Sequence, residues 1–306
     1  MNNIPHFTAE EILSFGMNKA ILSLKNGMTT SSEPISRGHI SLSNEEDFLL
    51  MPAFSSNGIG IKLVTVIPRN TKQGLPLVHG FYLYSDRLTG APKATLDGSA
   101  LTTLRTPAAS AVATEVLARK NVQTLGIFGT GVQARGHVES MLVVRPNIEE
   151  IIIFGRNPDS VNNFISSLNV DGRLLVSGTP GEAASCDVIC SCTSAKKAII
   201  PTESIREGAH INLIGSFSDA YREADVDLIQ NSDVYVDHRK AAEEEAGELI
   251  YAVKNGNWSF DKIIGDFLDL ITKKVERKNE SSITLFKSVG LATWDLLVAE
   301  SIINQS

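Results

Sequence analysis

One stretch of the chain limits the possible folds more than any other. Residues 124–142, TLGIFGTGVQARGHVESML, join an apolar strand pattern to a helical pattern through Gly129-x-Gly131-x-x-Ala134. The first glycine permits a tight turn, the second lets a pyrophosphate approach the backbone, and the alanine allows close packing of a helix whose N-terminus attracts an anion. An ordinary glycine turn is the alternative, but this strand and helix context is the one that dinucleotide binding requires. We therefore predict a Rossmann-type domain around this segment.

The residue that follows the second strand indicates which dinucleotide is bound. About twenty residues beyond the glycines, an NAD-binding chain carries an acid that binds the ribose 2′-hydroxyl. Here the strand pattern EIIIF at 150–154 is followed by Gly155, Arg156 and Asn157. A guanidinium can pair with a 2′-phosphate through two parallel hydrogen bonds, whereas a carboxylate would repel it. The sequence thus predicts NADPH as the cofactor, with NADH also accepted; a solvated arginine at a strand end is the alternative.

Short apolar runs alternate with helical or loop segments through the middle of the chain. They read TLGIFG, EIIIFG, RLLVSG, DVICSCT, HINLIG and DVYVD, and this alternation is typical of a doubly wound parallel sheet. The first third instead carries β-rich runs separated by Gly, Pro and Asn, which predict an antiparallel or mixed sheet. We expect residues 281–303, SSITLFKSVGLATWDLLVAESII, to form a last helix that packs on the first sheet.

The predicted fold class is therefore α/β, with a Rossmann-type doubly wound parallel sheet inserted in a second, α+β domain. Residues 118–284 form the dinucleotide-binding domain, and residues 1–117 plus 285–306 form the other. Residues 8–27 predict one amphipathic helix that begins with a Thr8/Glu11 capping box. The alanine-rich segment 106–120 predicts a helix that starts just after Arg105.

Composition excludes several classes of protein. Over 306 residues the formal net charge is −7, and Lys and Arg are spread along the sequence, so a nucleic-acid partner is not expected. The N-terminus has neither a basic nor an apolar signal region, and no window of about 18 apolar residues occurs, which predicts a cytoplasmic protein that does not enter a membrane. Cys186, Cys190 and Cys192 fall within one apolar run, CDVICSC, and are expected to be buried strand cysteines and not metal ligands.

Two further polar features have simple interpretations. The acidic run EEEAGEL at 243–249 is expected to be a solvated helix face, with Gly247 and Glu248 as candidates to border the site. His79 and His210 each stand in a strand pattern and are expected to be structural.

Several blocks of sequence resemble the ornithine cyclodeaminase and mu-crystallin family over nearly the whole chain. They are MPAF at 51–54, IKLV at 61–64, LDGSALTTLRTPAASA at 96–111, GTGVQA at 129–134, GAHINLIGSF at 208–217 and LFKSVG at 285–290. The resemblance implies a homodimer in which the first third and the last helix form a substrate-binding and dimerisation domain.

The same resemblance implies roles for particular residues. The carboxylate-binding basic residues of the family fall on Arg37, Lys62 and Arg105. The expected cofactor contacts are Thr106, Gly129, Gly131, Val132, Gln133, Arg156, Asn157, Thr193 and Lys287.

One departure from the family pattern bears on the reaction. Cyclodeaminases resemble GGDCPGKTE where this chain reads GSFSDAYRE, so their catalytic aspartate falls on Phe217, which becomes a substrate-binding candidate. Phenylalanine can neither accept a proton nor hold an ammonium by charge, so the imine reductases of the family are the closer analogy. The expected reaction is NAD(P)H-dependent reduction of a cyclic 2-imino acid, 1-pyrroline-2-carboxylate to L-proline, with 1-piperideine-2-carboxylate to L-pipecolate as a second possibility. The alternatives are ornithine cyclodeaminase or alanine dehydrogenase-like activity, or a mu-crystallin-like NADPH and ligand-binding protein.

The basic residues suit this chemistry on physical grounds. Arg37 and Arg105 stay charged and offer planar donors for a substrate carboxylate. Lys62 stands inside the apolar run GIGIKLVTV, so its charge must either face solvent or be retained in a site. Lys62 is expected to share in binding the carboxylate or to supply the proton for the imine nitrogen. Lys62 and Arg105 are therefore the predicted catalytic residues; a surface or ion-pair role is the alternative for each.

Overall fold

The computed structural model describes residues 4–215 and 218–305, and the chain divides into two compact units. The first unit is Met1–Ala109 with Leu291–Ser306, and the second is Ser110–Gly290. The sequence placed these boundaries at 117/118 and 284/285.

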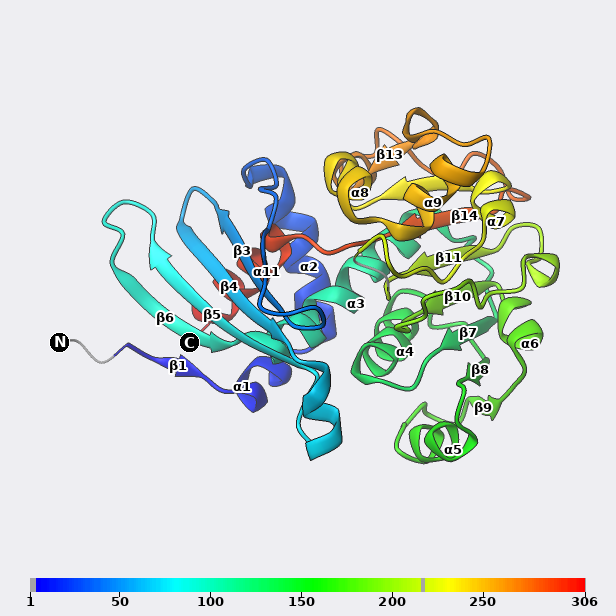
Figure 1. Ribbon diagram of the computed structural model, residues 1–306, viewed down its shortest axis with the longest axis horizontal. Helices are drawn as coiled ribbons and strands as arrows, with labels where there is room; N and C mark the ends of the chain where they lie inside the picture. The colour runs from blue at the N-terminus through cyan, green and yellow to red at the C-terminus, as the bar shows by residue number, and fades with distance from the viewer. Residues whose placement is uncertain (1–3, 216–217, 306) are drawn as a thin grey trace. The chain divides into compact units, whose positions relative to one another are not determined.

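A six-stranded sheet forms the centre of the first unit (Figure 1). Its strand order is β1-β6-β5-β4-β3-β2; β1 runs parallel to β6 and the other neighbours are antiparallel, which makes the predicted mixed sheet. The strands are β1 (His6–Phe7), β2 (Gly38–Ser41), β3 (Asp47–Phe54), β4 (Gly58–Val66), β5 (Val78–Asp86) and β6 (Pro92–Asp97). Burial alternates along β3 and β4, so one face of the sheet is covered and the other is partly open.

Helices cover the buried face of this sheet. The unit contains α1 (Ala9–Ser14), α2 (Met17–Gly27), η1 (Met28–Thr30), η2 (Pro68–Gln73) and α11 (Ala292–Ile303), and α11 packs on β3, β4 and α2. The Thr8/Glu11 capping box is present, but the single helix expected over residues 8–27 is two helices. Gly16 separates them because its φ of 83° lies in the left-handed region, which a continuous helix cannot contain.

A long helix, α3 (Gly98–Leu117), crosses the boundary between the units. The sequence placed its start after Arg105, which was wrong, because the side chain of Asp97 accepts a hydrogen bond from the backbone N–H of Ala100 at 2.8 Å and so caps the helix earlier. Arg105 and Pro107 therefore lie inside the helix.

The second unit is built on an eight-stranded sheet in which every pairing is parallel. Its order is β13-β12-β14-β11-β10-β7-β8-β9, which confirms the predicted doubly wound sheet. The strands are β7 (Thr124–Phe128), β8 (Glu150–Phe154), β9 (Leu174–Ser177), β10 (Val188–Ser191), β11 (His210–Leu213), β12 (Asp233–Val236), β13 (Gly265–Asp266) and β14 (Thr284–Lys287). The helices are α4 (Val132–Val144), α5 (Pro158–Ser166), α6 (Pro180–Ala184), η3 (Thr202–Ser204), α7 (Val226–Gln230), α8 (Arg239–Glu245), α9 (Gly247–Asn255), η4 (Phe260–Lys262) and α10 (Phe267–Ile271).

The last strand corrects the expected C-terminal helix. Residues 281–303 do not form one helix: β14 inserts between β11 and β12, and α11 begins only at Ala292. Gly290, with φ of 91°, lies in the connection between them. Because every residue of β14 is buried and pairs on both sides, residues 284–290 belong to the second unit.

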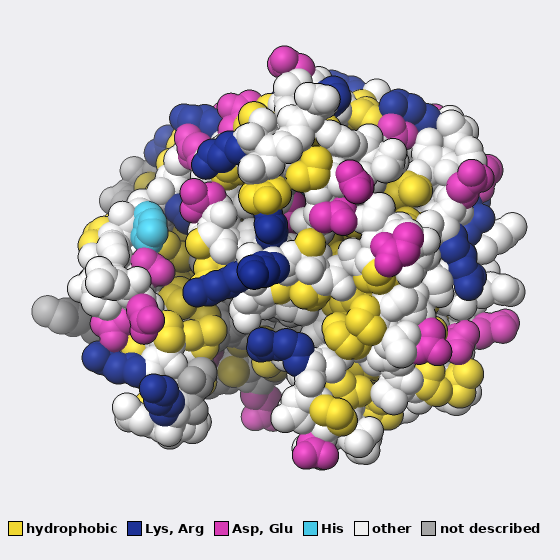
Figure 2. All heavy atoms as spheres, turned by 45° about the vertical axis from the view of Figure 1, so that its right-hand side comes forward, with side chains coloured by type: hydrophobic (Ala, Val, Ile, Leu, Met, Phe, Trp, Pro, Cys, Tyr) yellow, Lys and Arg dark blue, Asp and Glu magenta, His cyan; other side chains and the backbone are white. Residues whose placement is uncertain are grey.

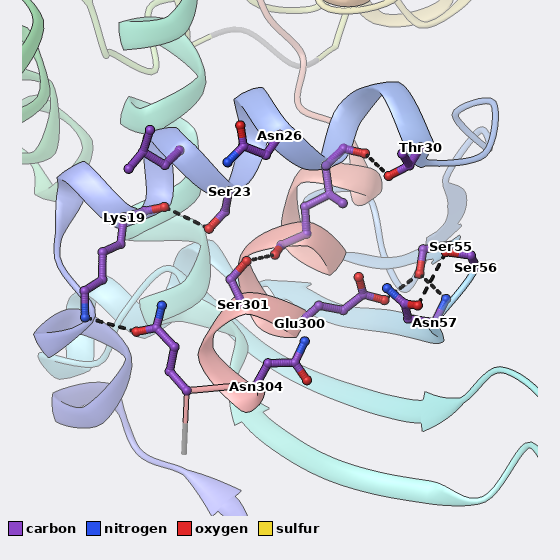
Figure 3. Close-up of a pocket in the computed structure, with 14 residues that line it drawn as sticks. Lys19, Ser23, Asn26, Thr30, Ser55, Ser56, Asn57, Glu300, Ser301 and Asn304 are labelled. Atoms are coloured by element: carbon purple, nitrogen blue, oxygen red, sulfur yellow. Dashed lines mark hydrogen bonds between the residues drawn. The ribbon is translucent and has the colours of Figure 1, made fainter.

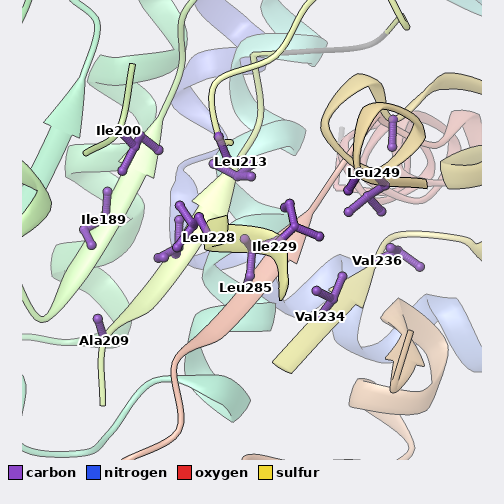
Figure 4. Packing of buried hydrophobic residues seen from close by; sticks show 14 of the residues in the cluster. Ile189, Ile200, Ala209, Leu213, Leu228, Ile229, Val234, Val236, Leu249 and Leu285 are labelled. Atoms are coloured by element: carbon purple, nitrogen blue, oxygen red, sulfur yellow. The ribbon is translucent and has the colours of Figure 1, made fainter. Parts of the chain in front are cut away.

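One apolar cluster packs a face of the second sheet (Figure 4). Side chains of the central strands, among them Ile189, Leu213 and Leu285, meet Leu228 of α7 and Leu249 of α9. On the face of the molecule in Figure 2, basic and acidic side chains are interspersed. Among the described residues, no helix combines the length and the apolar character needed to cross a membrane.

Candidate active site

Lys62 lies on the buried face of β4, only 1% exposed. Its Nζ donates hydrogen bonds to both carboxylate oxygens of Asp295, at 2.9 and 2.8 Å, and to Oγ1 of Thr102 at 3.0 Å. Lys62 therefore does not face solvent from the strand, and its charge is kept inside the unit by a partner from α11.

Arg105 shares the same carboxylate. Its Nε donates to Oδ1 of Asp295 at 3.1 Å, and its guanidinium lies over the ring of Trp294, 5.9 Å from the centroid. Arg105 is 5% exposed, and neither Nη nitrogen bonds to any residue that the structure describes. The guanidinium is thus held at one edge and retains its two-nitrogen edge for an anion.

The electrostatics of Lys62 reflect this burial. Desolvation is the largest cause that lowers its pKa, and the neighbouring cations Arg105 and Arg37 lower it further. Asp295 acts in the opposite sense by charge and by hydrogen bonding, and the resulting pKa is about 7. The lysine can therefore exchange a proton near neutral pH.

The structure brings together the three basic residues that the resemblance selected. Arg37, half-buried just before β2, is near enough to influence Lys62, which itself shares Asp295 with Arg105. Sequence analysis missed Asp295. The available signal was an acid within the apolar pattern ATWDLLVAE, which is unusual unless the acid is paired.

The predicted phosphate loop has the expected local geometry. Gly129 has φ of 109°, and a β-carbon there would approach the backbone oxygen of Cys192 to 2.8 Å. Gly131, the residue before α4, has ordinary extended backbone, and a β-carbon there would meet no atom of the described residues within 4 Å. Among the residues that the structure describes, no side chain caps α4, and the N-terminus of such a helix attracts an anion. These features fit a bound pyrophosphate.

The other residues expected to contact the cofactor differ in exposure. Val132, at the first position of α4, is 65% exposed, and Gln133 beside it is half-buried. Ala134 is fully buried, in agreement with its predicted packing role. Thr106, on α3 in the first unit, is buried, and its hydroxyl has no hydrogen-bond partner among the residues described.

Arg156 and Asn157 follow β8 and differ in what they do. Arg156 is exposed and makes no hydrogen bond or ion pair with the part of the chain that the structure describes. Asn157 caps α5, because its Oδ1 accepts from the backbone N–H groups of Asp159 at 2.9 Å and Ser160 at 3.1 Å. Arg156 is therefore available for a ligand, while Asn157 has a structural role besides the predicted cofactor contact.

A buried acid, Glu223, connects the ends of two central strands. Its Oε1 accepts from Oγ of Ser191 at 2.6 Å and from the backbone N–H and Oγ1 of Thr193, each at 2.7 Å. Its Oε2 accepts from the backbone N–H of Gly215 at 2.8 Å. Thr193, a predicted cofactor contact, is thus held at the carboxyl end of β10, the edge where ligands of such sheets bind.

A second buried acid, Glu248, extends this network. Its Oε1 accepts from the backbone N–H of Glu223 at 3.0 Å, and its Oε2 lies 3.1 Å from Nζ of Lys287. Burial and then the charge of Glu248 raise the pKa of Glu223, while Lys287 and the hydrogen bonds lower it. Glu243 and Glu244 are exposed, as expected of a solvated face, whereas Gly247 and Glu248, the candidates to border the site, are buried because α9 packs them into the unit.

The other candidate residues are Phe217, His210 and the cysteines of the run CDVICSC. Phe217 lies outside the described residues. His210 is fully buried and its Nδ1 is 2.9 Å from Oγ1 of Thr284, a structural position. Cys186 and Cys190 are buried and Cys192 is half-buried, and all three are free thiols.

These features define a protein with a dinucleotide-binding sheet and a separate buried basic cluster. The chain belongs to the ornithine cyclodeaminase/mu-crystallin family, whose sequence profile matches residues 15–306, and the family prediction is confirmed. A Delta(1)-pyrroline-2-carboxylate reductase of Bacillus thuringiensis subsp. konkukian is 36% identical over 289 residues, which are 92% of this chain and 88% of that protein. Protein SAR DEFICIENT 4 of Arabidopsis thaliana is 33% identical over 97% of this chain and 94% of its own length.

Solved structures show the same likeness. The Delta(1)-pyrroline-2-carboxylate reductase of Thermococcus litoralis, in complex with NADH and L-proline, superposes with a TM-score of 0.94 at 30% identity and covers 99% of this chain and 97% of its own. An archaeal alanine dehydrogenase dimer with bound NAD superposes with a TM-score of 0.92 at 28% identity, over 98% and 95% of the two chains.

Proposed function

We propose that the protein is an NAD(P)H-dependent reductase of cyclic 2-imino acids that converts 1-pyrroline-2-carboxylate to L-proline. The observation that carries the proposal is the buried cluster of Lys62, Arg105 and Asp295 in a chain so similar to reductases named for this substrate. A carboxylate anchor and a proton source lie side by side in that cluster, and the phosphate loop of the second unit fits a dinucleotide.

The roles of the residues follow from their contacts. The two Nη nitrogens of Arg105 bind the substrate carboxylate in a bidentate pair, with Arg37 adding positive charge. Lys62, with a pKa of about 7, gives a proton to the imine nitrogen. The nicotinamide supplies the hydride when bound. The C=N bond thus gains hydrogen at carbon and at nitrogen, which yields the secondary amine.

We propose NADPH as the preferred cofactor and NADH as an accepted one. The support is Arg156, exposed after β8 and unpaired within the described chain, in the position where a 2′-phosphate needs a cation. The Thermococcus relative was solved with NADH, so acceptance of both is part of the proposal.

A homodimer is also proposed. The face of the six-stranded sheet opposite Lys62 carries exposed apolar side chains on neighbouring strands: Ile40, Phe54, Ile59 and Phe81 are each 39–45% exposed. Such a patch marks an interaction surface, and the archaeal alanine dehydrogenase relative is a dimer. The protein is expected to work in the cytoplasm, since free thiols suit a reducing compartment.

The decisive experiment measures NAD(P)H oxidation against a small panel of substrates. Cyclic 2-imino acids of five and six ring atoms should be reduced, whereas pyruvate with ammonia should give little turnover, and L-ornithine with NAD should release no ammonia. Ammonia release would favour the cyclodeaminase alternative, and ligand binding without turnover would favour a mu-crystallin-like binding protein. Light scattering on the same sample gives the oligomeric mass.

A further inference from the structure

Asp295 is the acid that, within the described chain, both Lys62 and Arg105 contact. It is fully buried on α11, and α11 is buried at every position from Ala292 to Glu300. Oδ1 accepts from Lys62 at 2.9 Å and from Nε of Arg105 at 3.1 Å, while Oδ2 accepts from Lys62 at 2.8 Å. An acid in such surroundings is retained only when its charge is matched.

Lys62 uses all its N–H donors within the protein, whereas Arg105 keeps some of its donors for a ligand. An ammonium has three N–H groups, and three oxygens, two of Asp295 and one of Thr102, lie within 3.0 Å of Nζ of Lys62. Lys62 therefore has no donor left for a substrate carboxylate. Arg105 gives only Nε to Asp295, so its two-nitrogen edge remains.

We propose that Asp295 is a positioning residue, which orients Arg105 through Nε and holds the ammonium of Lys62 as the proton source. The catalytic part of this inference rests on the proposed function. The effect of Asp295 on the charge of Lys62 does not, because it can be measured without substrate. It also separates the roles of the two basic residues: Arg105 anchors the carboxylate and Lys62 handles the proton.

The charges around Lys62 make Asp295 necessary. α3 presents Arg105, and the segment before β2 contributes Arg37, both of which disfavour a second cation. β5 presents Tyr82 directly across the strand pair, and burial raises the pKa of its phenol, so it stays neutral. Asp295 is the anion that favours protonated Lys62; without it, the pKa of Lys62 would fall well below 7 and the proton would be lost at working pH.

The test follows the titration of Lys62 in the full chain without substrate. The protein is labelled with [ε-13C]lysine, the Lys62 signal is assigned by its loss in Lys62→Met, and its midpoint is measured by NMR. The wild-type midpoint is expected near 7. Asp295→Asn should lower it, and Arg37→Gln should raise it, because the two neighbours act in opposite senses. A midpoint that does not move in Asp295→Asn overturns the inference.

Kinetics then separate positioning from mere stability. In Asp295→Asn the KM for the imino acid should rise at least tenfold, because the neutral amide holds Nε of Arg105 more weakly than a carboxylate does, and kcat should fall at neutral pH. The alkaline limb of the pH profile of kcat/KM should move with the NMR midpoint in every variant. If the titration shifts as expected but no imino acid is reduced, the proposed function fails while the role of Asp295 in setting the charge of Lys62 stands.

A second comparison covers the case in which Asp295→Asn does not fold. Lys62→Met and Lys62→Met/Asp295→Asn form a matched pair, because the double variant removes one cation together with one anion. L-proline should bind at least tenfold more weakly to the double variant than to Lys62→Met, since only in the double variant is Nε of Arg105 held by a neutral amide in place of a carboxylate. Equal affinity for L-proline contradicts the positioning role.

Discussion

Gly129 and Gly131 stand two residues apart in one loop, yet only Gly129 is required by the fold of the unit itself. Gly129 has a left-handed backbone and lies against the backbone of Cys192, whereas Gly131 has an extended backbone and open space beside its Cα. The absence of a side chain at Gly131 therefore has no explanation among the residues that the structure describes in this unit. An approaching pyrophosphate supplies one.

Substitutions at these glycines should separate folding from cofactor binding. Gly131→Val should keep the melting temperature but lose binding of NADPH and NADH, because the side chain would fill the space that the pyrophosphate needs. Gly129→Ala should lower the melting temperature, since alanine is strained at φ of 109° and would contact the Cys192 carbonyl. Calorimetry and fluorescence titration with both dinucleotides measure the two effects. Tight cofactor binding by Gly131→Val would refute the phosphate-loop assignment.

Arg156 should decide between the two cofactors. Arg156→Asp replaces a phosphate-pairing cation with a repelling acid, so the KM for NADPH should rise tenfold or more while the KM for NADH changes little. Lys254→Asp, an exposed change on α9 with the same difference in charge, is the control and should affect neither value. Equal small changes in the KM for NADPH and the KM for NADH would show that the Arg156 side chain points to solvent and contacts neither cofactor.

Arg105 should control substrate affinity. Arg105→Met removes the anchor of the carboxylate and should lower kcat/KM for the imino acid by about two orders of magnitude, roughly the 3 kcal/mol of a charged hydrogen bond. Arg105→Lys keeps the charge but loses the planar geometry, and should fall between wild type and the Met variant. Cofactor affinity should be unchanged in both. A stable Arg105→Met variant with normal kinetics would show that the arginine is only an ion-pair partner of Asp295.

Two buried histidines should make the protein sensitive to acid. Burial lowers the pKa of His137 to about 4 and that of His210 to about 3. His137 is held in its neutral form, with Nδ1 2.7 Å from the carbonyl of Gln133 and Nε2 2.9 Å from Oγ of Ser110. Since an unfolded histidine has a pKa near 6.5, the unfolded chain binds more protons below that pH, and stability is lost as the pH falls from about 6.5 towards 4.

The size of this acid effect can be measured by denaturation at pH 7 and pH 5. Each histidine should contribute roughly 2 kcal/mol to the loss of stability between these values. His137→Gln should be less stable than wild type at pH 7 but should lose less stability on going to pH 5. The exposed His79 provides the control, because His79→Gln should leave the pH dependence as it is. If His137→Gln loses as much stability between pH 7 and pH 5 as wild type does, His137 is not a source of the acid sensitivity.

Close packing inside the first unit gives a stability prediction. A β-carbon on Gly60 would overlap the hydroxyl of Tyr82 and approach Cδ1 of Leu296 to 3.1 Å, so Gly60→Ala should cost about 1 to 3 kcal/mol. Tyr82→Phe removes a buried hydroxyl that has no hydrogen-bond partner among the described residues, and should be neutral or stabilising. The double variant should recover part of the loss. Additive effects in urea denaturation would show that the two positions do not interact.

Much of the second unit could be predicted because its signals are local. A parallel strand buried on both faces is a short apolar run, and the glycines of the phosphate loop stand at positions that one strand, one turn and one helix define. The same holds for the Thr8/Glu11 capping box, which needs only four consecutive residues. The family blocks added Lys62 and Arg105 through their sequence alone.

What the sequence could not show depended on contacts between distant segments. β14 was taken for helix because a short, partly apolar run such as TLFK is compatible with either structure, and only its pairing with β11 and β12 decides for a strand. Glu248 was a candidate to border the site, and only the structure shows that it is buried beside Lys287.

The sequence by itself determined the fold class, the family, the phosphate loop and the basic residues, because each can be recognised from short stretches of contiguous residues. Only the tertiary structure placed Asp295 against Lys62 and Arg105, which precede it by 233 and 190 residues. No local sequence pattern predicts these contacts. It arises because α11 packs on β4 and buries three charged side chains together, and a low-dielectric interior stabilises such charges only when they pair.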